Sequence, residues 1–167
     1  AVNGDRITQV GPVAGPAGEV IDGSGLVLAP GFIDIHSHTD ATVFENPSAE
    51  SKLLQGVTLE VTGNCGLGSF PVSEDRRDLL LDFLRMHDFR LPAKGLAWTD
   101  MQSFAAEVET AGVGLNLAPL VAHGPLRMAV MGSDDRPPAA DELQAMKSLL
   151  SGQLSQGAWG LSTGLIY

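Results

Sequence analysis

The chain has 167 residues, of which 44% are hydrophobic and 18% charged, which excludes a disordered segment and allows a folded core. Asp and Glu number 20 against 10 Lys and Arg, and the net charge of −10 argues against nucleic acid as a partner, because phosphates attract positive surfaces. One cysteine rules out an internal disulfide and favours a reducing, cytoplasmic location, and no apolar run approaches the ~20 residues that span a membrane.

Short strands are expected over residues 1–30. The dipeptide Asn3-Gly4 lies between two apolar residues and is typical of a hairpin turn, because both turn positions take positive φ. Residues 19–22 and 26–28 read as two further strands. Pro30-Gly31 interrupts this pattern, so we expect a domain boundary after residue 30.

Strands and helices alternate along residues 31–167. β-Branched and apolar runs predict four strands, and apolar residues at helical spacing predict helices between them. In chain order, the expected elements are strand 32–38, helix 48–55, strand 57–62, helix 73–89, a helix from the capping box at 99–102 to Gly112, strand 115–122, a helix opened by Pro137-Pro138, and strand 159–165.

Two details of this pattern can be checked in the structure. Pro119 interrupts the third strand and predicts a bulge there. The last helix carries one apolar stripe, formed by Leu143, Met146, Leu150 and Leu154.

The alternation of strands and helices predicts an α/β fold with a parallel sheet. Four strands with their helices fit either a doubly wound sheet or the first half of a (β/α)8 TIM-like barrel. A complete barrel needs about 250 residues, so 167 residues hold only part of one.

The motif His36-Ser37-His38 ends the first predicted strand. Residues two apart on a strand share a face and are separated by about 6.5 Å, so both imidazoles can bind one cation. Asp34 has the same parity, whereas Ile33 and Ile35 are expected to face the covering helices. Neutral imidazole is a common zinc ligand. The alternative is that one histidine caps the strand and the other is simply exposed.

Cys65 follows the second predicted strand, between two glycines that let the backbone bend. At the end of a neighbouring strand, its thiolate can join a site for a borderline-soft metal. Two other interpretations stay open: a small buried apolar residue, which free cysteine usually is, or a catalytic nucleophile with a basic partner.

Two more groups of candidate functional residues lie at the third and fourth predicted strands. His123 and Arg127 come after the third strand. His123 can contact a substrate or donate a hydrogen bond to a metal ligand, and Arg127 can pair with a carboxylate, or both can simply support a loop. Ser162 lies in the fourth strand, but no Gly-x-Ser-x-Gly elbow surrounds it, which disfavours a nucleophile.

These motifs together resemble a known family. The run APGFIDIHSH at 29–38 resembles the start of the barrel in the metal-dependent amidohydrolase superfamily. The runs VTGNCG at 61–66, HGPLR at 123–127 and GAWGLSTGLIY at 157–167 are similar to the N-acyl-D-amino-acid deacylase, or D-aminoacylase, branch. The resemblance implies part of a small β-sandwich over residues 1–30 and the first four β/α units of the barrel over residues 31–167.

The resemblance also implies a set of functional residues. His36, His38 and Cys65 match metal ligands for one or two Zn²⁺ ions. Tyr167 and His123 are expected to contact substrate, and Asp40 is expected to orient a ligand histidine. The family's two further histidines and its catalytic aspartate would follow Tyr167. The catalytic residue is therefore unknown within this chain.

The function implied is zinc-dependent hydrolysis of N-acyl-D-amino acids to a carboxylate and a D-amino acid. The chain lacks an initial Met and stops after a strand, so we expect an amino-terminal portion that is inactive without the remainder of the polypeptide. Two alternatives are another amidohydrolase, such as a dihydroorotase or hydantoinase relative, and a non-catalytic α/β binding module. The resemblance implies that many amidohydrolases bridge two metals with a carboxylated lysine from the fourth strand. The absence of a lysine there and the Gly-Asn-Cys-Gly turn disfavour the first of these alternatives.

Overall fold

The structure is a computed structural model that describes residues 1–89, 91 and 95–164. Its internal contacts divide the chain into two units, Ala1–Pro30 and Gly31–Tyr167. In the first unit, β1 (Val2–Asn3) and β2 (Arg6–Ile7) pair antiparallel, which confirms the predicted hairpin. Asn3 pairs with Arg6, so the two turn residues lie one position later than the dipeptide suggested.

The two further strands predicted in the first unit are wrong. Residues 19–22 and 26–28 are not in strands, and their apolar side chains face solvent, with Val20 84% and Leu28 94% exposed. A strand forms only when a neighbour accepts and donates its backbone hydrogen bonds. Neither segment pairs with another strand among the described residues.

The second unit is built on parallel strands. A three-stranded sheet has the order β3-β4-β5, and a second sheet pairs β6 with β7, all in parallel. The strands are β3 (Phe32–Asp34), β4 (Val57–Thr62), β5 (Asn116–Pro119), β6 (Val121–Ala122) and β7 (Leu161–Ser162).

Leu120 joins the two sheets. Its amide donates to Thr62 O on the β4 side at 2.9 Å, whereas the amide of Val121 donates to Gly160 O on the β7 side at 2.8 Å. The third predicted strand therefore changes partner just after Pro119, where an irregularity is expected. The parallel pairings follow chain order across all four predicted strands, as in part of a (β/α)8 barrel.

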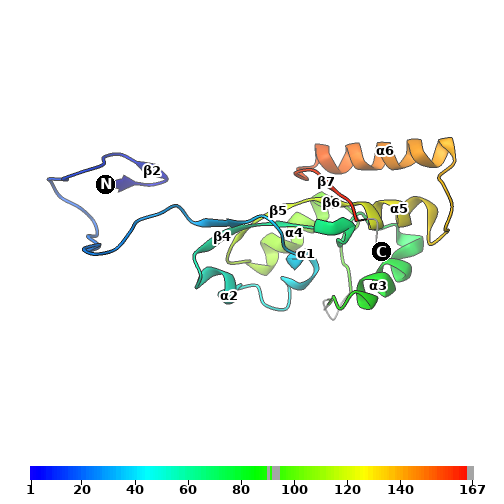
Figure 1. Cartoon of the computed structure of the whole chain (residues 1–167), viewed down its shortest axis with the longest axis horizontal. Helices are drawn as coiled ribbons and strands as arrows, with labels where there is room; N and C mark the ends of the chain where they lie inside the picture. The colour runs from blue at the N-terminus through cyan, green and yellow to red at the C-terminus, as the bar shows by residue number, and fades with distance from the viewer. Residues whose placement is uncertain (90, 92–94, 165–167) are drawn as a thin grey trace. The chain divides into compact units, whose positions relative to one another are not determined.

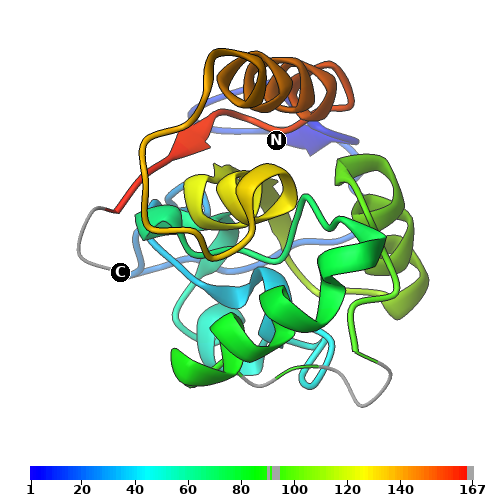
Figure 2. The ribbon, with the colours of Figure 1, turned by 90° about the vertical axis from the view of Figure 1, so that its right-hand side faces the viewer.

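Helices separate the strands along the chain. In order they are α1 (Thr39–Thr42), α2 (Glu50–Leu53), the 3₁₀ turns η1 (Asn64–Gly66) and η2 (Glu74–Arg76), α3 (Arg77–Met86), α4 (Met101–Ala111), α5 (His123–Met131) and α6 (Ala140–Ser155). Figure 1 shows α5 between α6 and α3, and Figure 2 shows the same order from another direction. None of the helices in the described part of the chain is long and apolar enough to cross a bilayer.

The sequence missed α5 entirely, because Gly124-Pro125 near its start is typical of a loop. Proline is tolerated in the first turn of a helix, where its missing N–H has no intrahelical partner. The strand predicted over 32–38 ends at Asp34, and the one over 159–165 is limited to Leu161–Ser162 within the described residues.

The hydrophobic core contains large aromatic side chains. Trp98 is 2% exposed and packs against Phe44 and Phe104, with ring centroids 4.9 Å and 5.3 Å away. Its indole N–H donates to Ser69 O at 2.8 Å, so the one polar atom of the buried ring is satisfied.

Helix α6 buries a polar residue that the apolar pattern did not predict. Met146 is buried as expected, but Leu143 and Leu154 are both 42% exposed, while Gln153 is only 3% exposed. The Gln153 Oε1 atom accepts a hydrogen bond from the amide of Met101 at 2.8 Å. Gln153 therefore caps the start of α4, where the first amides have no partner within the helix.

The capping box of α4 lies one residue later than predicted. Asp100 is the N-cap, and its side chain accepts from the amide of Ser103 at 2.9 Å, rather than Thr99 pairing with Gln102. Gly112 closes the helix in the left-handed conformation, as expected.

We expect Gln153→Leu to lower the free energy of unfolding of the full-length protein by about 1–3 kcal/mol, because the buried Met101 amide loses its acceptor. Gln144→Leu, at an exposed position of the same helix, is the matched control. Urea titration followed by tryptophan fluorescence measures both. Equal midpoints for the two variants would contradict the capping role.

Candidate metal centre

His36 and His38 lie beyond the end of β3, where the chain bends toward α1. The Asp34 carboxylate accepts a hydrogen bond from the amide of His36 at 3.1 Å, which fixes the backbone at this bend. The expectation that Ile33 and Ile35 face the covering helices is wrong. These side chains are 60% and 74% exposed, whereas Asp34 bonds to Lys52 of α2.

Asp34, not the isoleucines, contacts a helix. The Lys52 ammonium of α2 lies 2.5 Å from the Asp34 carboxylate. Successive strand residues alternate between faces, so the neighbouring isoleucines point the other way. The hydrogen bond from Lys52 also lowers the pKa of Asp34, which keeps the carboxylate ionised.

Cys65 lies in η1, directly after β4, in a turn that only a few residue types tolerate. Cys65 itself has a φ of +57°, in the left-handed region that non-glycine residues rarely adopt. Gly63 precedes it with a φ of +74°, and a β-carbon at Gly63 would lie 2.5 Å from Leu120 O. Both the backbone conformation and the close approach of the next strand therefore require glycine here.

The three predicted ligands converge. One possible ligand atom from each of His36, His38 and Cys65 lies within 4.8 Å of the others. The His36 Nε2 and Cys65 Sγ atoms are 3.2 Å apart, and the two imidazole rings have centroids 5.5 Å apart. The chain thus brings together side chains that are 29 residues apart in the sequence.

The electrostatics of the cluster suit a cation. Burial, and then the neighbouring His36, lower the pKa of His38, so its imidazole is neutral at physiological pH. The buried Nδ1 atom of His38 has no hydrogen-bond partner, and a polar atom in that position needs one. Two imidazoles and a thiol form a donor set that zinc prefers, and three protein ligands leave a position open for water or substrate.

Asp40 supports the Cys65 turn. Its side chain is completely buried and accepts from the amide of Gly63 at 3.2 Å and from that of Ser69 at 2.8 Å. The sequence led us to expect Asp40 to orient a ligand histidine. Its hydrogen bonds in the described structure go instead to the backbone on either side of Cys65. Burial raises the pKa of Asp40 to about 6, although hydrogen bonds from Ser69 and Gly63 oppose the change.

Ser162 supports the same turn from the opposite side. Its hydroxyl donates to Gly63 O and accepts from the amide of Gly66 at 3.1 Å. The Asn64 side chain adds a donor to Val61 O at 2.8 Å and to Ser37 O at 3.3 Å, which links the turn to the His36–His38 segment. Ser162 is thus engaged in hydrogen bonds to the backbone of the turn.

His123 is the first residue of α5, which begins beside the Cys65 turn. A β-carbon at the next residue, Gly124, would lie 2.7 Å from Gly66 O, so the start of α5 and the turn are in close contact. No described contact joins His123 to the three clustered side chains. Tyr167, the other predicted substrate contact, lies outside the described residues. Both substrate roles therefore stay predictions.

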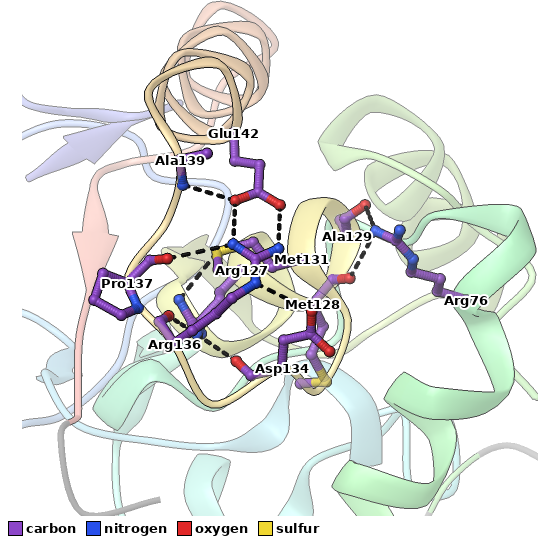
Figure 3. A network of polar contacts seen from close by, with 10 residues as sticks. All are labelled: Arg76, Arg127, Met128, Ala129, Met131, Asp134, Arg136, Pro137, Ala139 and Glu142. Atoms are coloured by element: carbon purple, nitrogen blue, oxygen red, sulfur yellow. Dashed lines mark hydrogen bonds and ion pairs between the residues drawn. The ribbon is translucent and has the colours of Figure 1, made fainter.

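Arg127 lies in α5 and supports the loop that follows this helix. Its guanidinium donates to the carbonyls of Asp134 and Arg136 at 2.6 Å and 2.8 Å, as Figure 3 shows. Arg136 in turn forms a bidentate ion pair with Glu142 at the start of α6. This network fixes the loop between α5 and α6. Arg127 therefore supports a loop, which is one of the two roles that the sequence allowed.

The raised pKa of Asp40 predicts a pH-dependent stability. The pKa of the Asp40 carboxyl is 3.8 in the unfolded state and about 6 in the folded state. Between these two pH values, the folded state therefore retains a proton that the unfolded state has already released. This stabilising contribution is fully present below about pH 4 and is lost as the pH rises through about 6.

We therefore expect the free energy of unfolding of the metal-free protein to fall from about pH 4 to about pH 7 by up to about 3 kcal/mol relative to Asp40→Asn. Chemical denaturation at several pH values measures the difference. Asp78→Asn, at an exposed position of α3, controls for loss of a carboxyl group. Parallel pH profiles for the unaltered protein and Asp40→Asn would contradict the expectation.

Known proteins match this chain over most of its length. The model of the amidohydrolase family matches residues 19–166. The N-acyl-D-aspartate deacylase of Alcaligenes xylosoxydans xylosoxydans is 38% identical over 168 residues, covering 100% of this chain and 32% of that protein. The D-aminoacylase of the same organism is 34% identical and covers 99% of this chain and 33% of its own length.

Solved structures show the same relationship. The N-acyl-D-glutamate deacylase from Bordetella bronchiseptica, solved with zinc and a phosphonate mimic of the tetrahedral intermediate, has a TM-score of 0.69 at 35% identity. A D-aminoacylase studied for its binuclear metal centre has a TM-score of 0.67 at 35% identity. Each comparison covers 83% of this chain and 28% of the other.

The chain thus spans about a third of the length of the curated relatives it matches. Its fold is that of the corresponding part of the D-aminoacylase structures, and its family match covers both the His36–His38 segment and the Cys65 turn. This chain belongs to the amidohydrolase family.

Proposed function

We propose that the full-length protein containing this chain is a zinc-dependent hydrolase that cleaves the amide bond of N-acyl-D-amino acids, releasing a carboxylate and a D-amino acid. The observation that carries the proposal is the convergence of His36, His38 and Cys65, with ligand atoms within 4.8 Å of one another. Similarity to deacylases along the whole chain supports the substrate class and disfavours a non-catalytic module.

In this proposal, His36, His38 and Cys65 hold zinc, while Asp40 and Ser162 fix the turn that presents the thiolate. Bound zinc would supply Lewis acidity, which lowers the pKa of a coordinated water and polarises the scissile carbonyl. The neutral His38 imidazole needs no deprotonation before it binds, because its pKa is already lowered. His123 and Tyr167 are proposed to contact the substrate.

Three carboxylates lie near the clustered ligands in sequence, those of Asp34, Asp40 and Glu60. We assign none of them as the proton acceptor for the attacking water. Asp34 is paired with Lys52, and Asp40 accepts from two backbone amides. Glu60 is 1% exposed and bonds to Lys52 and to two hydroxyl groups. A general base must reach the proton that it removes, and these side chains are already engaged.

We also infer how the two units fit the complete enzyme. Residues 31–167 would form the first four β/α units of the barrel, and residues 1–30 would form part of a small β-sandwich. The sheet order and the match to one part of the D-aminoacylase structures support this division. The remaining ligands and the catalytic aspartate are proposed to lie outside these 167 residues, so the chain alone should be inactive.

The first test is metal content. We expect the full-length protein to carry near-stoichiometric zinc, and Cys65→Ala and His36→Ala to lose most of it, since each removes a ligand. Elemental analysis by plasma mass spectrometry gives the zinc-to-protein ratio. His87→Ala, on a histidine outside the cluster, is the matched control. Unchanged zinc in both ligand variants would contradict the proposed centre.

The second test is substrate handedness. We expect the full-length enzyme to hydrolyse N-acetyl-D-amino acids and to leave the L enantiomers intact. Release of free amine, measured with a panel of acidic and apolar side chains, determines the preference. The His36→Ala variant controls for contaminating hydrolases. Equal rates on both enantiomers would reject the deacylase assignment but not membership of the amidohydrolase family.

A further inference from the structure

The charged side chains of Asp34, Lys52 and Glu60 form a cluster beside the His36–His38 segment. The Lys52 Nζ atom lies 2.5 Å from Asp34 Oδ2 and 2.8 Å from Glu60 Oε1, so one ammonium bridges two carboxylates. Glu60 is the most buried member, with a side chain that is 1% exposed in the middle of β4. The three residues come from β3, α2 and β4 and carry a net charge of −1.

The cluster holds the ligand segment at three points. The Glu60 Oε2 atom accepts hydrogen bonds from the hydroxyl of Ser37, at 3.2 Å, and from that of Thr39. Asp34 accepts from the amide of His36 at 3.1 Å. These contacts fix the residues on both sides of His38 and the backbone of His36, and none of them uses an imidazole nitrogen.

Stability alone does not explain the buried carboxylate of Glu60, which is 1% exposed while Lys52 and Asp34 are 30% and 27% exposed. Removing a charge from water costs several kcal/mol, and a well-packed apolar residue of similar volume often gives equal or greater stability. The geometry offers a different explanation, because the two hydroxyl groups that Glu60 binds flank a proposed metal ligand. Groups behind a metal's ligands orient them, and their loss usually weakens metal affinity.

We propose that Glu60 is a positioning residue, whose carboxylate, held by Lys52, sets the spacing of His36 and His38 through the hydroxyls of Ser37 and Thr39. This inference rests on the proposed zinc centre. Glu60 makes no contact with substrate and takes no part in proton transfer. Its effect is on how well the two imidazoles are aligned before the metal arrives.

The experiment compares two pairs of variants in the full-length protein. Glu60→Gln keeps the shape of the side chain and removes its charge, and Glu107→Gln on the exposed face of α4 is its control. Thr39→Val removes the hydroxyl that Glu60 binds, whereas Thr39→Ser retains it. The zinc dissociation constant is measured by competition with a chromophoric chelator, and thermal unfolding of the metal-free proteins is recorded in parallel.

We expect Glu60→Gln and Thr39→Val to weaken zinc binding by about 10–100-fold, and Thr39→Ser and Glu107→Gln to bind as the unaltered protein does. A second measurement uses Co²⁺ in place of zinc. The visible d–d bands of the Co²⁺-loaded protein report ligand geometry, so they should shift in Glu60→Gln and in Thr39→Val. If Glu60→Gln does not fold, the Thr39 pair gives the answer alone.

Unchanged zinc affinity and unchanged Co²⁺ bands in folded Thr39→Val and Glu60→Gln would overturn the inference, even if both variants unfold at lower temperature. That outcome would make the cluster a purely structural ion pair. The proposed function fails in a different way. If the unaltered full-length protein binds no zinc, the metal centre itself is rejected and the inference is rejected with it.

Discussion

The Cys65 turn depends on hydrogen bonds that come from distant parts of the chain. A cysteine in the left-handed region is strained, and such a conformation persists only when its surroundings hold it. Asp40 from α1 binds the amides on both sides of the turn, and Ser162 from β7 binds Gly63 and Gly66. The thiol therefore points at His36 because two separate elements fix the backbone beneath it.

The cluster of possible ligands was predictable from sequence, whereas its support was not. Histidines two apart and a cysteine between glycines are local patterns, and each follows a strand whose end lies at the same edge of the sheet. The partners of Asp40 and Ser162 are backbone groups, which look the same at every position of a sequence. One signal for the buried cluster was present: Glu60 interrupts the otherwise apolar and β-branched strand over 57–62.

The differences between the predicted and the observed secondary structure also come from contacts that a sequence does not display. The strand over 57–62 was predicted to the residue, because its β-branched run is bounded by glycines and it pairs on both sides. Residues 19–22 have comparable composition but lack a partner, and no strand forms. Helix α5 was missed because Gly124 reads as a breaker, although its missing side chain is what lets the helix approach Gly66 O. Residue preferences fail to predict a strand or helix where tertiary contacts determine whether it forms.

The bond between Ser162 and Gly63 also sets an order of assembly. The two residues are 99 positions apart, so this contact closes a long loop and costs more conformational entropy than a local contact. During synthesis, the histidines emerge well before the residue that completes the thiol-bearing turn. A partly made chain thus lacks the two hydrogen bonds by which the β7 segment supports the turn.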